Sequence, residues 1–223
     1  FETLGLAPPE IPSPRGACID SGALTAVLPA RLRNTHKGSF GNAGILGGAP
    51  GMVGAALLAG RAALKLGAGR VFVGLFSDTP TVDPAQPELM LRPAQDLLNA
   101  DELDCIALGP GLGRSQSAQH ALAAVIARPL PLILDADALS LIAAQPDLQQ
   151  RLAARGHATI LTPPPAEAAR LLATSTEEIQ HDRIASARTL AQRFNAGVVL
   201  KGCGSVCVLK NGDWHINASG NPG

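Results

Sequence analysis

Three glycine-rich segments carry the residues best suited to chemistry: residues 36–69, residues 109–113 (GPGLG) and residues 201–205 (KGCGS). Each adjoins a short apolar run. A backbone without side chains can bring its N–H groups close to an anion. Because the crevice of an open α/β sheet forms where strands end, the three segments together predict a ligand rich in phosphate.

Charged side chains stand next to these segments. Lys201 ends an apolar run, so it could add a point charge to a phosphate site or be merely solvated. Glu167 opens a predicted helix, where a carboxylate caps the helix or holds Mg²⁺ through water. Asp135 and Asp137 follow another apolar run and either cap the next helix or face the ligand. The residue types alone leave both interpretations open.

Several familiar motifs are absent. No GxxxxGK[ST] occurs, which excludes a P-loop NTPase, and neither HExxH nor GxSxG occurs, so hydrolase chemistry has little support. The turn at 109–113 reads GxGxG rather than GxGxxG, and by itself it is a weak dinucleotide motif. Cys203, Cys207 and His215 make only a weak case for zinc.

The amino-acid composition limits which binding partners and which compartment we expect. Eighteen basic residues balance eighteen acidic ones without a block of one sign, which argues against nucleic acid. No apolar stretch is long enough to span a membrane. Four cysteines without CxxC spacing predict reduced thiols, and we expect a cytoplasmic protein.

Apolar runs alternate with helical patterns along the chain, which predicts an α/β fold with a parallel sheet covered on both faces. Asn211-Gly212 predicts a hairpin, so the sheet is expected to end antiparallel. Strands are expected over 43–46, 71–75, 105–108, 132–134, 159–161, 198–200, 206–209 and 214–216. Helices are expected over 52–66, 118–127 and 139–154, from Glu167, and after a capping box at 175–178.

Seven motifs in sequence resemble one known family. They are HKGSFG, GILGGAPGMVGAALLAGRAALKLGAGRV, ALGPGLG, LILDADAL, ILTPPPAEAARLL, VVLKGCGSV and INASGNPG. In this order they closely resemble the ADP/ATP-dependent NAD(P)H-hydrate dehydratases, the C-terminal module of two-domain repair enzymes in the ribokinase-like superfamily. The resemblance covers residues 31–223 and implies a three-layer αβα fold. Residues 1–30 are expected to be a linker, and FETLGLAPP is similar to the tail of the preceding epimerase module.

The resemblance implies a lyase that repairs hydrated NADH or NADPH. In the family, ADP or ATP with Mg²⁺ is thought to phosphorylate the ring hydroxyl, after which phosphate leaves and the double bond returns. Carried over by motif, Ala55, Gly111 and Gly113 would contact the hydrated dinucleotide, together with Pro164. The adenine nucleotide would lie along Lys201, Gly202, Cys203, Gly204 and Ser205, and Glu167 would be the metal-organising carboxylate.

Two departures from the family pattern matter. Pro164 stands where the family commonly has a substrate-contacting histidine, and Ala166 stands where it has glycine. The family's next turn, which carries the presumed catalytic aspartate, would lie beyond Gly223, so the domain is expected to be incomplete at its C-terminus. A homo-oligomer, such as the tetramer common among relatives, is also expected. Two alternatives stay open: a kinase for a small alcohol and a non-catalytic nucleotide-binding fragment.

Overall fold

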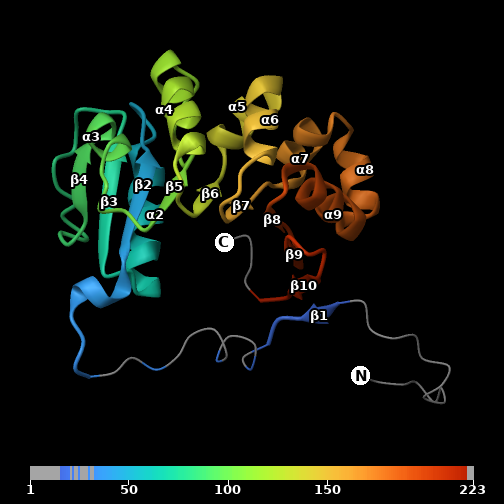
Figure 1. Ribbon diagram of the computed structural model, residues 1–223, viewed down its shortest axis with the longest axis horizontal. Helices are drawn as coiled ribbons and strands as arrows, with labels where there is room; N and C mark the ends of the chain where they lie inside the picture. The colour runs from blue at the N-terminus through green and yellow to red at the C-terminus, as the bar shows by residue number, and fades with distance from the viewer. Residues whose placement is uncertain (1–15, 21, 23–24, 26–29, 31–32, 220–223) are drawn as a thin grey trace.

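The computed structural model describes residues 16–20, 22, 25, 30 and 33–219, and within these a ten-stranded sheet organises the chain (Figure 1). The strands lie in the order β1-β10-β9-β8-β7-β6-β5-β2-β3-β4. Their bounds are β1 (Ala17–Cys18), β2 (Asn42–Gly47), β3 (Arg70–Leu75), β4 (Met90–Pro93), β5 (Cys105–Leu108), β6 (Leu132–Leu134), β7 (Thr159–Leu161), β8 (Gly197–Leu200), β9 (Ser205–Val208) and β10 (Trp214–Asn217).

Helices lie on both faces of this sheet, with α2 on one face and the row from α3 to α9 on the other (Figure 1). Their bounds are η2 (Lys37–Phe40, a 3₁₀ turn), α2 (Val53–Leu66), α3 (Ala94–Leu98), α4 (Gln116–Ala127), α5 (Asp137–Ala144), α6 (Pro146–Ala153), α7 (Pro165–Leu172), α8 (Thr176–His181) and α9 (Arg183–Phe194). The predicted αβα layering is confirmed.

All neighbouring strands from β8 across the sheet to its edge at β4, in the order β8-β7-β6-β5-β2-β3-β4, pair in parallel. The exception is the predicted C-terminal hairpin, in which β9 pairs antiparallel with both β8 and β10. β1 then pairs parallel with β10. The mostly parallel sheet with an antiparallel hairpin is therefore confirmed.

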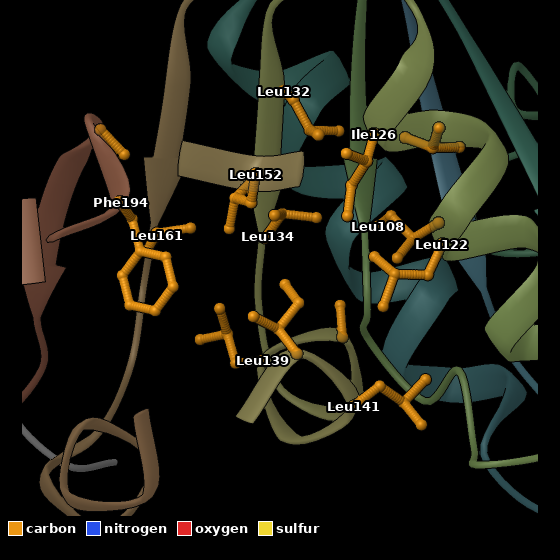
Figure 2. Close-up of a cluster of buried hydrophobic side chains, with 14 of the residues drawn as sticks. Leu108, Leu122, Ile126, Leu132, Leu134, Leu139, Leu141, Leu152, Leu161 and Phe194 are labelled. Atoms are coloured by element: carbon orange, nitrogen blue, oxygen red, sulfur yellow. The ribbon is translucent and has the colours of Figure 1, made fainter. Parts of the chain in front are cut away.

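The larger core lies between the sheet and the row of helices from α3 to α9. Alternate strand residues point into it, as period-two alternation requires. Leu108, Leu134 and Leu161 each have 0% exposure. Figure 2 shows these leucines from neighbouring strands gathered with Leu139 of α5 and Phe194 of α9. This apolar layer fixes the positions of the strand ends that matter below.

The smaller core lies under α2. Val71 and Val73 of β3 point into it, whereas Phe72 between them points into the larger core. α2 ends at Gly67, which is left-handed (φ 104°) and donates to the carbonyls of Ala63 and Leu64, as its place after the helical pattern predicts. Ile133 of β6 and Ile160 of β7 lie on the same face of the sheet as α2. No described helix covers them, and they are 39% and 40% exposed.

The helical patterns expected near 139–154 form two helices, because Pro146 has no N–H to continue α5 and instead begins α6. Two other expectations about elements were wrong. The helix expected after the capping box is also two, since Ser175 caps α8 and Asp182 then caps α9 by accepting from the Ala185 N–H at 2.9 Å. In the proline-bearing connection after β3, β4 and α3 were missed.

Some expectations fall outside the described residues. The epimerase-like segment FETLGLAPP and the last four residues, 220–223, are not described. The division into a linker (1–30) and a domain (31–223) stays a prediction. Among the described residues, no helix is both long and apolar enough to cross a membrane.

Candidate active site

The carboxyl ends of the central parallel strands meet at one edge of the sheet, and the predicted site residues follow them. Backbone hydrogen bonds join each strand end to the next. The N–H groups of Gly109, Asp135 and Thr162 donate to the carbonyls of Leu46, Leu108 and Leu134, each at 3.1 Å, and the Lys201 N–H donates to Pro163 at 2.9 Å. This edge is where open α/β sheets bind ligands.

The first two glycine-rich segments contact each other directly. The Ala49 N–H donates to the carbonyl of Gly111 at 2.7 Å. Gly111 has φ +61°, and a Cβ built on it would lie 2.5 Å from the carbonyl oxygen of Met52 and 3.3 Å from Cβ of Ala55. Only glycine fits there. The structure thus places Ala55 and Gly111, both predicted to contact the dinucleotide, side by side.

Asp135 and Asp137 connect the glycine-rich turns at either side of them. Asp135 Oδ1 lies 2.6 Å from Lys201 Nζ, and Asp137 Oδ2 accepts from the Gly113 N–H at 2.9 Å. The sequence left open whether these carboxylates cap a helix or face the site. The structure shows each bound to a predicted ligand-binding turn.

The residue between the two aspartates is strained. Ala136 has φ 48° and ψ −119°, a backbone conformation that non-glycine residues rarely adopt. Such strain persists where the surrounding structure over-determines it, commonly at functional sites. On either side of this residue, Asp135 binds Lys201 and Asp137 binds Gly113, so the two carboxylates contact different loops.

Glu167 lies in the first turn of α7, where its backbone N–H donates to the carbonyl of Pro164, the N-cap residue, at 3.0 Å. Among the described residues, its Oε2 is buried and has no hydrogen-bond partner. Burial raises the pKa of this carboxyl, Lys201 opposes that rise, and Asp135 adds to it. An ionised oxygen held away from water without a partner calls for a cation or a proton.

The third turn, residues 201–205, follows β8 and is partly exposed. Its carbonyls are bound by a residue that the sequence did not single out, Arg183 of α9. Only the folded structure brings Arg183 to this turn, because the two segments are about 20 positions apart and no motif joins them. The hydroxyl of Ser205 donates to the carbonyl of Gly202 at 3.1 Å.

A hollow of about 350 Å³ opens beside Lys201 and Asp135. Thr162 and Pro110 from neighbouring strand ends and Ala59 of α2 also line it. A second hollow of about 400 Å³ lies at β3 and β4, and none of the predicted site residues lines it. The first hollow is therefore the one that belongs to the predicted site.

The cysteines do not add a metal site. All four are free thiols, and burial raises the pKa of both Cys105 and Cys207. Cys207 lies opposite His215 on the neighbouring strand. Within the described ranges, however, no three His, Cys, Asp or Glu side chains converge to hold a metal directly.

Comparison with known proteins gives consistent matches. The family model for NAD(P)H-hydrate dehydratase matches residues 43–223. The chain is 40% identical over 202 residues to the ADP-dependent (S)-NAD(P)H-hydrate dehydratase of Neisseria meningitidis, covering 88% of this chain and 68% of that relative. It is 37% identical to the bifunctional NAD(P)H-hydrate repair enzyme Nnr of Coxiella burnetii, and its match spans 40% of that protein's length.

Solved structures agree with this assignment. The ADP/ATP-dependent NAD(P)H-hydrate dehydratase from Bacillus subtilis, co-crystallised with ATP/Mg²⁺, superposes with a TM-score of 0.76 at 31% identity, covering 92% of this chain and 74% of that one. A ribokinase-like superfamily protein from Enterococcus faecalis superposes with a TM-score of 0.79 at 25% identity, covering 95% and 75%. The predicted ribokinase-like fold is confirmed, and the chain belongs to the NAD(P)H-hydrate dehydratase family.

Proposed function

We propose that this protein uses ADP or ATP to dehydrate hydrated NADH or NADPH, which makes it a carbon–oxygen lyase of cofactor repair. The observation that carries the proposal is the role of the segment 135–137. Through Asp137 it holds the turn at Gly113, and through Asp135 it holds Lys201. Two phosphate-bearing ligands would therefore lie side by side, one along each turn.

The chemistry needs little more than positioning and charge neutralisation. The ring hydroxyl gives up its proton, and its oxygen bonds to the terminal phosphorus of the nucleotide as the bridging P–O bond breaks. The nucleotide then leaves with one phosphate fewer, and the hydroxyl has become a good leaving group. The carbon–oxygen bond then breaks, inorganic phosphate leaves with the bonding pair, and loss of a proton from the neighbouring carbon restores the double bond. Holding the hydroxyl and the phosphoryl group in contact contributes part of the acceleration, and neutralising the phosphoryl charge contributes the rest.

Named residues supply these demands. Ala55, Gly111 and Gly113 leave room for the dinucleotide backbone, and Pro164 borders it without offering a hydrogen bond. Lys201 and the amides of Gly202, Cys203 and Gly204 face the adenine nucleotide, and Ser205 closes the turn through its bond to Gly202. Lys201 adds positive charge where the phosphates would lie.

The site also fits Mg²⁺. The buried, unpartnered Oε2 of Glu167 is a hard oxygen donor. Since no three His, Cys, Asp or Glu side chains of the described residues converge on one point, Glu167 would hold the ion through water, which suits the octahedral hydration of Mg²⁺. When bound, the ion would neutralise the charge of the transferring phosphoryl group.

An assay of hydrated NADH with the purified protein tests the proposal. With ADP or ATP and Mg²⁺ present, the absorbance of the dihydronicotinamide should return, and it should not return when the nucleotide is left out. Phosphorylated product that accumulates without elimination would favour the small-alcohol kinase. Stabilisation by ADP without turnover would favour the non-catalytic nucleotide-binding module.

Three further proposals concern the whole protein. The name of the Coxiella relative supports fusion to an epimerase module, which a mass measurement of the endogenous protein would test. Self-association into a homo-oligomer, expected to be a tetramer, is testable by sedimentation. Four free thiols support a reducing compartment such as the cytoplasm.

A further inference from the structure

Arg183, the first residue of α9, binds four backbone carbonyls at the end of β8 and in the turn after it. Its Nη1 donates to the carbonyls of Cys203 at 2.6 Å and Gly204 at 3.1 Å. Its Nη2 donates to those of Leu200 at 3.1 Å and Lys201 at 3.2 Å. The guanidinium fork thus fills the inner side of the 201–205 turn, and the planar spacing of its donors fixes the shape of the turn.

The same contacts decide where the amides of the turn point. Carbonyls of the turn accept hydrogen bonds from Arg183, and the N–H groups of the turn remain available to other partners. Across the described residues, the amides of Gly202, Cys203 and Gly204 donate to no protein acceptor. Successive free N–H groups in a turn form a concave anion-binding surface.

Gly202 is matched to this arrangement. Its φ is +149°, and a Cβ built on it would lie 2.7 Å from Nη2 of Arg183. A side chain at this position would displace the guanidinium. The glycine and the arginine therefore form one unit, although they are 19 positions apart.

We infer that Arg183 is a positioning residue for the nucleotide site: it does not touch the nucleotide but holds the 201–205 turn with its free amides directed to the phosphates. The inference rests on the proposed function, because that function assigns the turn to the adenine nucleotide. Its charge also adds to the positive potential beside Lys201.

Arg155 shows what a purely structural arginine does in the same chain. It is 8% exposed and binds the carbonyls of Ile126, Arg128 and Leu130 and the hydroxyl of Thr159. These groups lie at the C-terminal end of α4 and beside the amino ends of β6 and β7, which is the edge of the sheet opposite the candidate site. Arg155 therefore offers a matched control for Arg183.

The test compares R183K with R155K, because each variant keeps the charge and replaces a fork by a single ammonium group. R183K should raise both the KM and the directly measured Kd for ADP about tenfold, since fewer charge-assisted hydrogen bonds hold the turn. Its kcat at saturating ADP and its KM for hydrated NADH should change less than about twofold. R155K should lower Tm and leave the Kd for ADP unchanged.

A second pair separates geometry from charge. R183A should weaken ADP binding more than R183K does, whereas R188A, which removes an exposed charge from the same helix, should leave it unchanged. An unchanged Kd for ADP in R183K and R183A, an equal rise of both KM values, or an effect of R188A equal to that of R183K would each overturn the inference. If the wild-type protein itself binds no adenine nucleotide, it is the proposed function that fails, and calorimetry of the unmodified protein shows this separately.

Discussion

Nζ of Lys201 lies 2.6 Å from Oδ1 of Asp135, although the two residues are 66 positions apart in the chain. The side chains are 43% and 30% exposed, so water reaches the pair. The pair orients the ammonium group across the ends of β6 and β8 without burying it. A phosphate can therefore contact the same ammonium group while Asp135 still binds it.

Replacing Lys201 should separate binding from stability. K201A should reduce the free energy of unfolding by no more than about 1 kcal/mol, because an exposed ion pair contributes little. It should weaken ADP binding about tenfold or more, because the point charge for phosphate is lost. Thermal melts and calorimetry measure the two effects. K210A, which removes an exposed lysine from the hairpin, should change neither.

Gly111 should tolerate no side chain. G111A forces a Cβ against the carbonyl of Met52 at positive φ, which should cost about 1–3 kcal/mol of stability and weaken dinucleotide binding. Chemical unfolding and the KM for hydrated NADH measure these effects. G156A is the control, because a Cβ there meets nothing within 4 Å and should leave both quantities unchanged. Equal stability of the two variants would contradict the close packing of the two glycine loops.

Glu167 should make the ligand-free protein less stable as pH rises. Its pKa is raised in the folded state, so the folded protein holds this proton more tightly than the unfolded chain does. The free energy of unfolding therefore falls as pH rises through the ordinary pKa of glutamate, about 4.3, toward the raised value, and it stays lower above that value.

E167Q removes this titration. Its Tm should exceed that of the wild type at neutral pH, and the difference should shrink as the pH is lowered through the same window. Turnover by E167Q should require more Mg²⁺. Melts across pH test the first expectation and a Mg²⁺ titration of the rate tests the second. E178Q, at an exposed glutamate of α8, should behave as the wild type does in both.

Ala136 should gain stability as glycine. A136G relieves a positive φ, which contributes more than the entropy that glycine adds to the unfolded chain, so the net gain should be about 1 kcal/mol. Because glycine holds Asp135 and Asp137 less rigidly, kcat/KM should fall even though stability rises. Unfolding and steady-state kinetics test both. A loss of stability would show that the surrounding contacts, rather than the backbone, set this conformation.

The architecture was predictable because strands such as 105–108, 132–134 and 159–161 are short apolar runs bounded by turns, and the structure has these bounds unchanged. The expected helix boundaries were wrong where one residue interrupts a pattern, as Asp182 does between α8 and α9. Glycine positions indicated close backbone contact, which the structure shows where Gly111 lies against Met52. The sequence could not tell a solvated Lys201 from a paired one, nor find Arg183, because both depend on contacts between segments that only the folded sheet brings together.

The crevice draws its walls from strand ends that run along the chain from Gly47 to Lys201. During synthesis, the turn at 201–205 therefore cannot take its place beside the other strand ends until β8 has emerged from the ribosome and joined β7. Shorter nascent chains would lack the turn that is proposed to hold the adenine nucleotide. On the proposed function, nucleotide binding would follow the formation of the strands from β2 to β8 and could not guide their early folding.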